Sequence, residues 1–309
     1  MKITKLMRNT KIKHCSLCCS DQLKLVYKGP MRYSGGKKQL DTGHEIYYCS
    51  KCHVEQIHPF PAQLDCCYQD GTYWQENKMI DTNCDLLHSK ALDENLLWLN
   101  KIGLNSLRNK KVIDFGCGTG AFLDLIKGFT LQSIGIEADP NLCSYVSSKG
   151  HTVFNSIQEA VDAGIKADIL CSFDVLEHLP NPIGTLKNLH HLLINYSSLF
   201  IGVPNQDDFI KKLVPAYCGH FYHIEHMWYF SNKSLTHVVE NAGFRFDKSL
   251  YLHKYNFMNL VEWAKTGTPP NLPTSNVIDE DLNSRFTDWL EDRGLASHLL
   301  IAATNVIPS

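Results

Sequence analysis

The feature that most constrains the fold is a glycine-rich turn between an apolar run and an amphipathic segment. The apolar run ends at Asp114, and Gly116, Gly118 and Gly120 follow before residues 121–126 start a helical pattern. A strand, a tight turn and a helix start in this order are typical of the ligand site of an open α/β sheet. Glycine suits such a turn because it adopts positive φ and lets a ligand approach the backbone.

Two classes of ligand fit this turn. Gly116, Gly118 and Ala121 satisfy the dinucleotide fingerprint in its Ala-ending variant. A pyrophosphate on the helix N-terminus would, however, be repelled by a carboxylate as close as Asp114. A ligand with a cationic end is attracted to the same carboxylate. S-adenosylmethionine carries a sulfonium and an ammonium group and no phosphate, so the charge pattern favours it over a dinucleotide.

Two motifs point to one superfamily. The order Val112-x-Asp114-x-Gly116-x-Gly118-x-Gly120 resembles the first motif of class I S-adenosylmethionine-dependent methyltransferases. The run Phe-Asp-Val-Leu-Glu-His-Leu over residues 173–179 resembles the fourth motif of the same superfamily. The resemblance implies a Rossmann-like sheet of seven strands and transfer of a methyl group from S-adenosylmethionine. A structural glycine turn in another α/β protein is the alternative interpretation.

The pattern of the remaining elements agrees with an α/β fold. Strands and helices alternate up to residue 203, which predicts a parallel, doubly wound sheet. Apolar residues at helical spacing predict a helix over 84–102, in front of the first strand. Later strands are expected at 133–137, 151–154, 167–173, 198–203, 244–251 and 299–304, and later helices at 184–194, 231–243 and 279–293.

The predicted cofactor contacts lie at the ends of these strands. Glu137 follows the glycine turn by about 20 residues, where an acid accepts hydrogen bonds from both ribose hydroxyls. Related methyltransferases often carry an acid for adenine after the third strand; this chain has Asn155 and Ser156, so another carbonyl would take that role. His178 is either a base or a residue that shapes the site through a local hydrogen bond. The full set is Asp114, Gly116, Cys117, Gly118, Gly120, Glu137, Ala138, Asn155, Ser156, Ser172, Phe173, Asp174 and His178.

Four of the 12 cysteines form two Cys-x-x-Cys pairs, Cys15 with Cys18 and Cys49 with Cys52. Two such pairs make a tetrahedral thiolate set suited to a structural zinc ion. Neighbouring Cys19 and His53 are alternative ligands, and reduced cysteines without a metal are the other interpretation.

The cysteine pairs also suggest a division of the chain. We expect a zinc ribbon with its connector over residues 1–75 and a methyltransferase domain over 76–309. An insertion at about 205–230 breaks the alternation of strands and helices, and such loops at strand ends often carry substrate contacts.

The insertion contains His220, His223, Glu225 and His226 among aromatic residues. His223, His226 and a carboxylate could ligate zinc or iron, or Glu225 and His226 could form a general-base pair; an aromatic core is the third interpretation. The cysteine pairs and the tyrosines after them resemble the N-terminus of sugar C-methyltransferases, which use a Glu-His dipeptide with tyrosines to handle protons. That resemblance implies His226, Glu225 and Tyr73 as catalytic residues.

Composition excludes several classes of protein. The net charge of −2 provides no basic field for nucleic acid. No stretch approaches the ~18 apolar residues of a membrane span, and the start lacks the features of a signal peptide. We therefore expect a cytoplasmic protein with a small-molecule substrate and without a nucleic-acid or membrane partner.

The leading functional hypothesis is methyl transfer to a small oxygenated metabolite, such as a sugar or a nucleotide-linked sugar. An RNA methyltransferase with a zinc module for docking is one alternative, and a zinc-ribbon interaction protein whose methyltransferase fold only binds ligand is another. The sequence fixes neither the acceptor atom nor the oligomeric state, and a homodimer is compatible with it.

Overall fold

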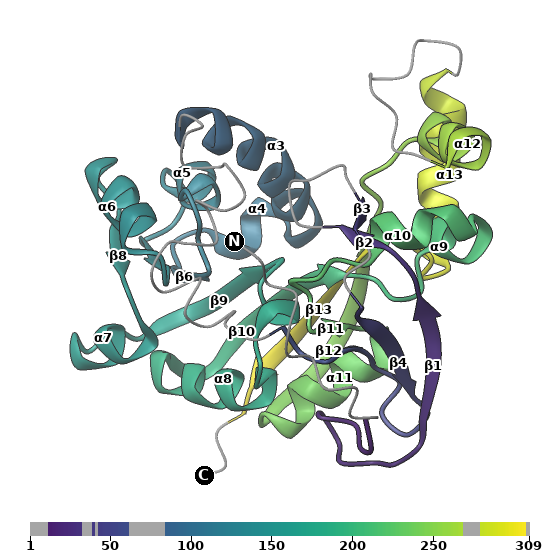
Figure 1. Ribbon diagram of the computed structural model, residues 1–309. Helices are drawn as coiled ribbons and strands as arrows, with labels where there is room; N and C mark the ends of the chain where they lie inside the picture. Colours follow the sequence, from purple (N-terminus) through teal and green to yellow (C-terminus); the bar gives the residue numbers. More distant parts are fainter. Residues whose placement is uncertain (1–11, 33–38, 41–42, 62–83, 268–278, 307–309) are drawn as a thin grey trace.

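The computed structural model describes residues 12–32, 39–40, 43–61, 84–267 and 279–306. A seven-stranded sheet runs through the middle of the molecule, with α3, α5 and α6 on one face and α7, α8 and α11 on the other (Figure 1). The predicted doubly wound α/β fold with seven strands is therefore confirmed. None of the helices in the described ranges is long and apolar enough to cross a membrane.

The strand order of this sheet is β12-β13-β10-β9-β6-β7-β8. All neighbours are parallel except at β13, which runs antiparallel to both β10 and β12. The order reverses between β6 and β9, and ligands of open α/β sheets bind outside the carboxyl ends of the strands at such a point. The strands are β6 (Lys111–Phe115), β7 (Gln132–Ile136), β8 (Thr152–Phe154), β9 (Ala167–Phe173), β10 (Leu193–Pro204), β12 (Phe244–Leu252) and β13 (His298–Asn305).

Polar caps set the helix boundaries. The predicted helix over 184–194 was wrong at both ends: Asn181 caps a helix that begins at Pro182, and a strand already starts at Leu193. The Asn181 side chain accepts the Gly184 N–H, which replaces a missing helical partner. The helices are α3 (Cys84–Ile102), α4 (Leu104–Leu107), α5 (Ala121–Ile126), α6 (Pro140–Ser148), α7 (Ile157–Asp162), α8 (Pro182–Leu189), α9 (Phe209–Leu213), α10 (Cys218–Phe221), α11 (Asn232–Asn241), α12 (Phe257–Thr266) and α13 (Glu280–Asp292), with 3-10 turns η1 (Leu176–His178), η2 (His190–Leu192) and η3 (Pro215–Tyr217).

A second sheet joins the cysteine segment to the insertion. Its order is β1-β4-β5-β11, and β11 belongs to the insertion after β10, so the two predicted units share one sheet. The predicted boundary at residues 75 and 76 lies outside the described residues. The strands of this sheet are β1 (Leu23–Lys28), β4 (Glu45–Cys49), β5 (Glu55–His58) and β11 (Trp228–Tyr229); β2 (Met31–Arg32) pairs separately with β3 (Gln39–Leu40).

Buried polar contacts strengthen this junction. Lys211 in the insertion forms an ion pair of 2.7 Å with Glu55 on β5, and the Tyr222 hydroxyl donates to the same carboxylate. The backbone of Arg32 donates to Tyr222 and accepts from Ile224. Apolar side chains from both sheets form one continuous core. The cysteine segment therefore packs directly against the insertion.

Candidate active site

The glycine turn lies at the switch point, at the carboxyl end of β6. Gly116, Gly118 and Gly120 all have positive φ, at 78°, 52° and 76°. A Cβ added at Gly116 would lie 2.4 Å from a methyl group of Val175, so this position excludes any side chain. The Gly116 and Cys117 N–H groups both donate to the Ile136 carbonyl at the end of β7. The turn is therefore held against the neighbouring strand.

Two buried acids flank the turn. Asp114 is 4% exposed and Glu137 is 8% exposed. The Glu137 carboxylate accepts the Gly118 N–H at 2.8 Å and the Asp139 N–H at 3.0 Å. Burial, and then the charge of Glu137, raise the pKa of Asp114 to about 8. Burial also raises the pKa of Glu137, against the backbone N–H groups that stabilise its charge. Two neighbouring buried acids repel each other when both are ionised, and a cationic ligand group would relieve that repulsion.

The contacts predicted after β8 have other roles in this structure. The Ser156 hydroxyl caps α7 by accepting the Glu159 N–H at 3.1 Å. Asn155 is exposed, and its N–H donates to the Glu159 carboxylate. Ala138 is exposed in the turn after β7. A direct role for Asn155, Ser156 and Ala138 in adenine binding stays a prediction.

The residues predicted at the end of β9 lie beside the glycine turn. Ser172 donates to the Phe115 carbonyl at 3.0 Å and so joins β9 to β6 at the switch point. The Phe173 ring stacks on Trp98 of α3, with centroids 5.2 Å apart. Asp174 has a positive φ of 55° and forms an ion pair of 3.2 Å with Lys254. Burial raises the pKa of Asp174, but Lys254 and His298 outweigh burial and hold it below its usual value.

A second polar cluster lies where β9 gives way to η1. Ligand atoms of Glu177, His178 and His226 lie within 4.8 Å of one another. Glu177 is 1% exposed, and neither carboxylate oxygen has a hydrogen-bond partner. The His178 Nδ1 lies 3.1 Å from the Glu225 carbonyl, the local hydrogen bond that the sequence offered as one alternative. We call these three residues the Glu177 cluster.

Burial determines the charge of the Glu177 cluster. It lowers the pKa of His178 to about 4 and holds that of His226 well below its usual value, so both imidazoles are neutral at pH 7. Burial and the neighbouring Asp174 raise the pKa of Glu177. The His223 ring stacks on His226 at 4.4 Å, but His223 is not a member of the cluster.

The Glu177 carboxylate lies within 4.8 Å of a ring nitrogen of His226. The side chain of Glu225 interacts electrostatically with Arg32 and Tyr229. Tyr73, the third predicted catalytic residue, lies outside the described residues. The structure thus brings one of the three predicted catalytic side chains into the Glu177 cluster and adds an acid that the sequence had placed in the cofactor motif.

The two Cys-x-x-Cys pairs converge as expected for a metal site. The sulfur atoms of Cys15, Cys18, Cys49 and Cys52 all lie within 4.8 Å of one another, and two cross-pair distances are 3.6 Å. Tetrahedral zinc with ~2.3 Å bonds places its sulfur ligands ~3.8 Å apart. The donor set therefore fits a closed zinc site.

The alternative ligands are directed elsewhere. Cys19 is exposed, and the His53 Nδ1 bonds the Tyr48 hydroxyl at 2.7 Å. Both residues have positive φ and donate an N–H back to the first cysteine of their pair, which closes each turn. Cys19 and His53 thus shape the two cysteine turns, and the prediction that they could replace a ligand was wrong for this geometry.

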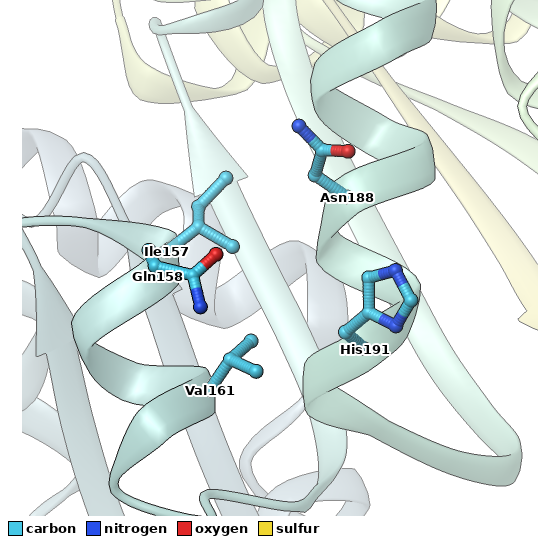
Figure 2. Close-up of a pocket in the computed structure, with 5 residues that line it drawn as sticks. All are labelled: Ile157, Gln158, Val161, Asn188 and His191. Carbon is cyan, nitrogen blue, oxygen red and sulfur yellow. The ribbon is translucent and has the colours of Figure 1, made fainter.

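A surface cleft of about 340 Å³ lies apart from these residues. Figure 2 shows its lining side chains on α7 and on α8 with the turn that follows it: Ile157, Gln158, Val161, Asn188 and His191. It contains no member of the predicted site and no cluster of charged groups.

Comparisons with known proteins agree with this geometry. A family model described as a methyltransferase domain matches residues 87–249, more than half of the 309-residue chain. The chain belongs to this methyltransferase-domain family. The predicted class I methyltransferase fold is thereby supported from sequence as well as from strand order.

The relatives of this methyltransferase-domain chain are distant. It is 31% identical over 112 residues to an uncharacterized protein of Methanocaldococcus jannaschii, covering 35% of this chain and 48% of that protein. It is 31% identical over 114 residues to a ubiquinone biosynthesis O-methyltransferase of Glaesserella parasuis, covering 33% and 48%. The chain thus spans about half the length of these relatives. A crystal structure of a SAM-dependent methyltransferase from Archaeoglobus fulgidus has a TM-score of 0.47 and 17% identity, covering 75% of this chain and 99% of that one.

Sequence reasoning missed several residues of this methyltransferase-domain site. Lys254 follows the carboxyl end of β12, and it forms an ion pair with Asp174. His298 also lies near Asp174, but it begins β13, which runs antiparallel to its neighbours. A search of strand carboxyl ends alone cannot find the amino end of an antiparallel strand. Arg32 comes from the cysteine segment, and its Nε donates to the His220 carbonyl. The contact of Arg32 with the insertion can be seen only once the two distant segments are paired in the structure.

Proposed function

We propose that this chain transfers the methyl group of S-adenosylmethionine to a small oxygenated metabolite, with a sugar or nucleotide-linked sugar as the expected class. The observation that carries the proposal is the pair of buried acids, Asp114 and Glu137, around the glycine turn of a methyltransferase-domain family member. The name of one relative, an O-methyltransferase, supports oxygen as the acceptor atom.

The residues of the pocket suit the proposed cofactor. Asp114 would hold the α-ammonium group, and Glu137 would accept hydrogen bonds from the ribose hydroxyls. When bound, S-adenosylmethionine supplies the methyl group and an uncharged leaving group. The contribution of the chain is chiefly positioning, which in favourable cases supplies ~7–11 kcal/mol.

The acceptor would lie at the Glu177 cluster, on the other side of β9. His226, the predicted catalytic residue, is a member, whereas Glu225 supports the cluster through its carbonyl bond to His178. An alcohol must lose its proton as the new bond forms, and neutral imidazoles in a buried site suit that requirement. Tyr73 stays a predicted contributor to this side of the pocket.

A structural zinc ion in the four-cysteine site is part of the proposal. The thiolates would leave no open coordination position, so the ion would stabilise the fold without taking part in methyl transfer. Its supporting observation is the sulfur geometry given above. Elemental analysis of the purified chain should find one zinc ion per chain.

A labelled-methyl transfer assay tests the proposed function. The full chain is incubated with labelled S-adenosylmethionine and a panel of sugars, nucleotide sugars, phenols and RNA. We expect label on an oxygenated small molecule, and we expect Glu137→Gln to weaken S-adenosylhomocysteine binding by about tenfold, the loss of one hydrogen bond to a charge. Asp168→Asn, which changes a similar backbone contact at the amino end of β6, away from the glycine turn, is the control. Label on RNA alone would contradict the proposed acceptor class.

A further inference from the structure

The Glu177 cluster contains an unusual buried acid. Glu177 belongs to η1, the 3-10 turn that follows β9, and both of its carboxylate oxygens are inaccessible to water and without a hydrogen-bond partner. A buried carboxyl group without a partner costs free energy, so native proteins keep one chiefly where a ligand completes it. The Nδ1 atom of His226 is likewise buried and without a partner. Glu177 and His226, two members of one cluster, therefore both have buried polar atoms that a bound group could contact.

The donor types indicate what that group is. Two imidazoles and one carboxylate are a common ligand set for divalent first-row transition metals, and they leave coordination positions open. We propose that Glu177, His178 and His226 bind a divalent transition-metal ion, to which the methyl acceptor presents its oxygen. This inference rests on the proposed function and adds a metal to its acceptor side.

The surroundings of His178 fit a ligand role. Histidines that bind metals usually donate their other ring N–H to a carbonyl or a carboxylate, which fixes the ring. The His178 Nδ1 lies 3.1 Å from the Glu225 carbonyl, the type of contact that fixes such a ring. The role of Glu225, next to His226 in the chain, would then be to orient a ligand.

The spacing requires only a small adjustment. Neighbouring ligands of an octahedral ion with ~2.1 Å bonds lie ~3 Å apart, whereas the three ligand atoms lie within 4.8 Å of one another. Side-chain rotations that move the ligand atoms by about an ångström would bring them to this spacing. The positive groups nearby are already engaged: Lys254 pairs with Asp174, and Arg32 donates to the His220 carbonyl.

The ion would account for acceptor activation. A divalent cation lowers the pKa of a hydroxyl that binds it, as it does for water. The hydroxyl proton passes to solvent, an oxygen–carbon bond forms, and the carbon–sulfur bond breaks with its electron pair left on sulfur. In this account His226 holds the ion instead of removing the proton itself, the metal alternative that the sequence left open with His223 in place of His178.

Manganese binding tests the inference on the zinc-loaded full chain. Mn²⁺ is added, and its binding is followed by electron paramagnetic resonance while zinc is counted by elemental analysis. We expect one Mn²⁺ site besides the zinc ion. Glu177→Gln and His226→Gln, which keep similar side-chain shapes, should each weaken Mn²⁺ binding by about 100-fold, at the upper end of effects seen for weaker, supporting contacts of metal sites. The zinc content should stay at that of the parent chain.

Controls separate this inference from the proposed function. His237→Ala on α11, where the ring contacts Asn241, should leave Mn²⁺ binding unchanged. Equal Mn²⁺ affinity in the parent chain and in both cluster variants would overturn the inference, as would lost turnover in His226→Gln with no Mn²⁺ bound by the parent chain. In either case, intact S-adenosylhomocysteine binding would leave the proposed function standing, whereas its absence would refute that function.

Discussion

The glycine-turn site around Asp114 and Glu137 and the junction between the cysteine segment and the insertion are built in different ways. In the glycine-turn site, the hydrogen bond from Gly118 to Glu137 joins residues 19 positions apart. At the junction, the pair of Lys211 and Glu55 joins residues 156 positions apart, and the bond from Arg32 to His220 spans 188. A site made from one βαβ unit can be recognised in a short stretch of sequence. The contact between the cysteine segment and the insertion depends on long-range packing. We expect substitutions at that contact to have the largest effects on stability.

The largest expected effect comes from the zinc site. Cys52→Ser should abolish zinc binding and destabilise the chain by more than about 4 kcal/mol, because zinc binding contributes directly to folding. Methyl transfer should fall with it, since β5 follows Cys52 and pairs with β11 beside His226. Exposed Cys19 offers a matched control, and Cys19→Ser should keep zinc, melting temperature and turnover. A zinc-free variant with native stability and turnover would show that neither property depends on the four-cysteine site.

The ion pair between the two segments should have the next largest effect. Lys211→Met leaves the buried Glu55 carboxylate without its cation and should cost ~3–5 kcal/mol in urea unfolding. The exposed pair of Lys212 and Asp207 is the control, because Lys212→Met should cost less than about 1 kcal/mol. Equal costs for the two lysines would mean that the ion pair of Lys211 and Glu55 is not buried at the junction.

A smaller effect on stability is expected from a substitution in the glycine turn. Gly116→Ala places a methyl group 2.4 Å from Val175 at a φ of 78° and should cost ~3 kcal/mol, with lost S-adenosylhomocysteine affinity. Gly103→Ala has a similar φ of 82° but meets no atom within 4 Å, so it should cost only ~1 kcal/mol. Thermal unfolding and calorimetry of both variants measure the difference. Identical losses would show that the contact with Val175 does not matter.

The smallest expected effect is a pH dependence of cofactor affinity. The pKa of Asp114 is raised to about 8 by burial and by Glu137, so the free chain is mostly protonated there at pH 7. Nearby Cys117 and Cys171 stay neutral because burial raises the pKa of each thiol. A ligand ammonium group favours the ionised acid, so affinity should rise by up to tenfold per pH unit below pH 8 and then level off.

Folding stability should move the opposite way. The folded pKa of Asp114 lies above the unfolded value, so the folded chain binds the extra proton, and the contribution of Asp114 to free-chain stability should fall as pH rises from about 4 to about 8. Asp114→Asn should remove this contribution, so the difference in unfolding free energy between the parent chain and the variant should change with pH in that range, and the pH dependence of affinity should be lost. Calorimetry at several pH values, paired with urea unfolding, checks the two signs together.

The same contrast explains what could be predicted from the sequence. The glycine turn, Glu137 and the four cysteines follow local rules of backbone conformation and ligand spacing, and the structure brings each of them where those rules expect. The strand over 167–173 and the helix over 84–102 were predicted with their observed bounds, because long periodic segments carry the strongest signal.

The surroundings of the Glu177 cluster could not be predicted in the same way. The two-residue strand β11 has no periodicity to detect, and its pairing with β5 depends on tertiary packing. Glu177 was visible within a cofactor motif, but nothing in the sequence shows that His226 lies beside it. The position of His298 could be predicted only with the knowledge that β13 is antiparallel.

The central claim is that the site beside Asp114 and Glu137 binds S-adenosylmethionine and its product, both of which carry an α-ammonium group, and not a diphosphate. Titration calorimetry of the purified chain with S-adenosylhomocysteine and, separately, with NADH tests it most directly. We expect S-adenosylhomocysteine to bind one site per chain, more weakly after Asp114→Asn, and NADH to give no binding heat. Saturable NADH binding without any S-adenosylhomocysteine binding would contradict the claim.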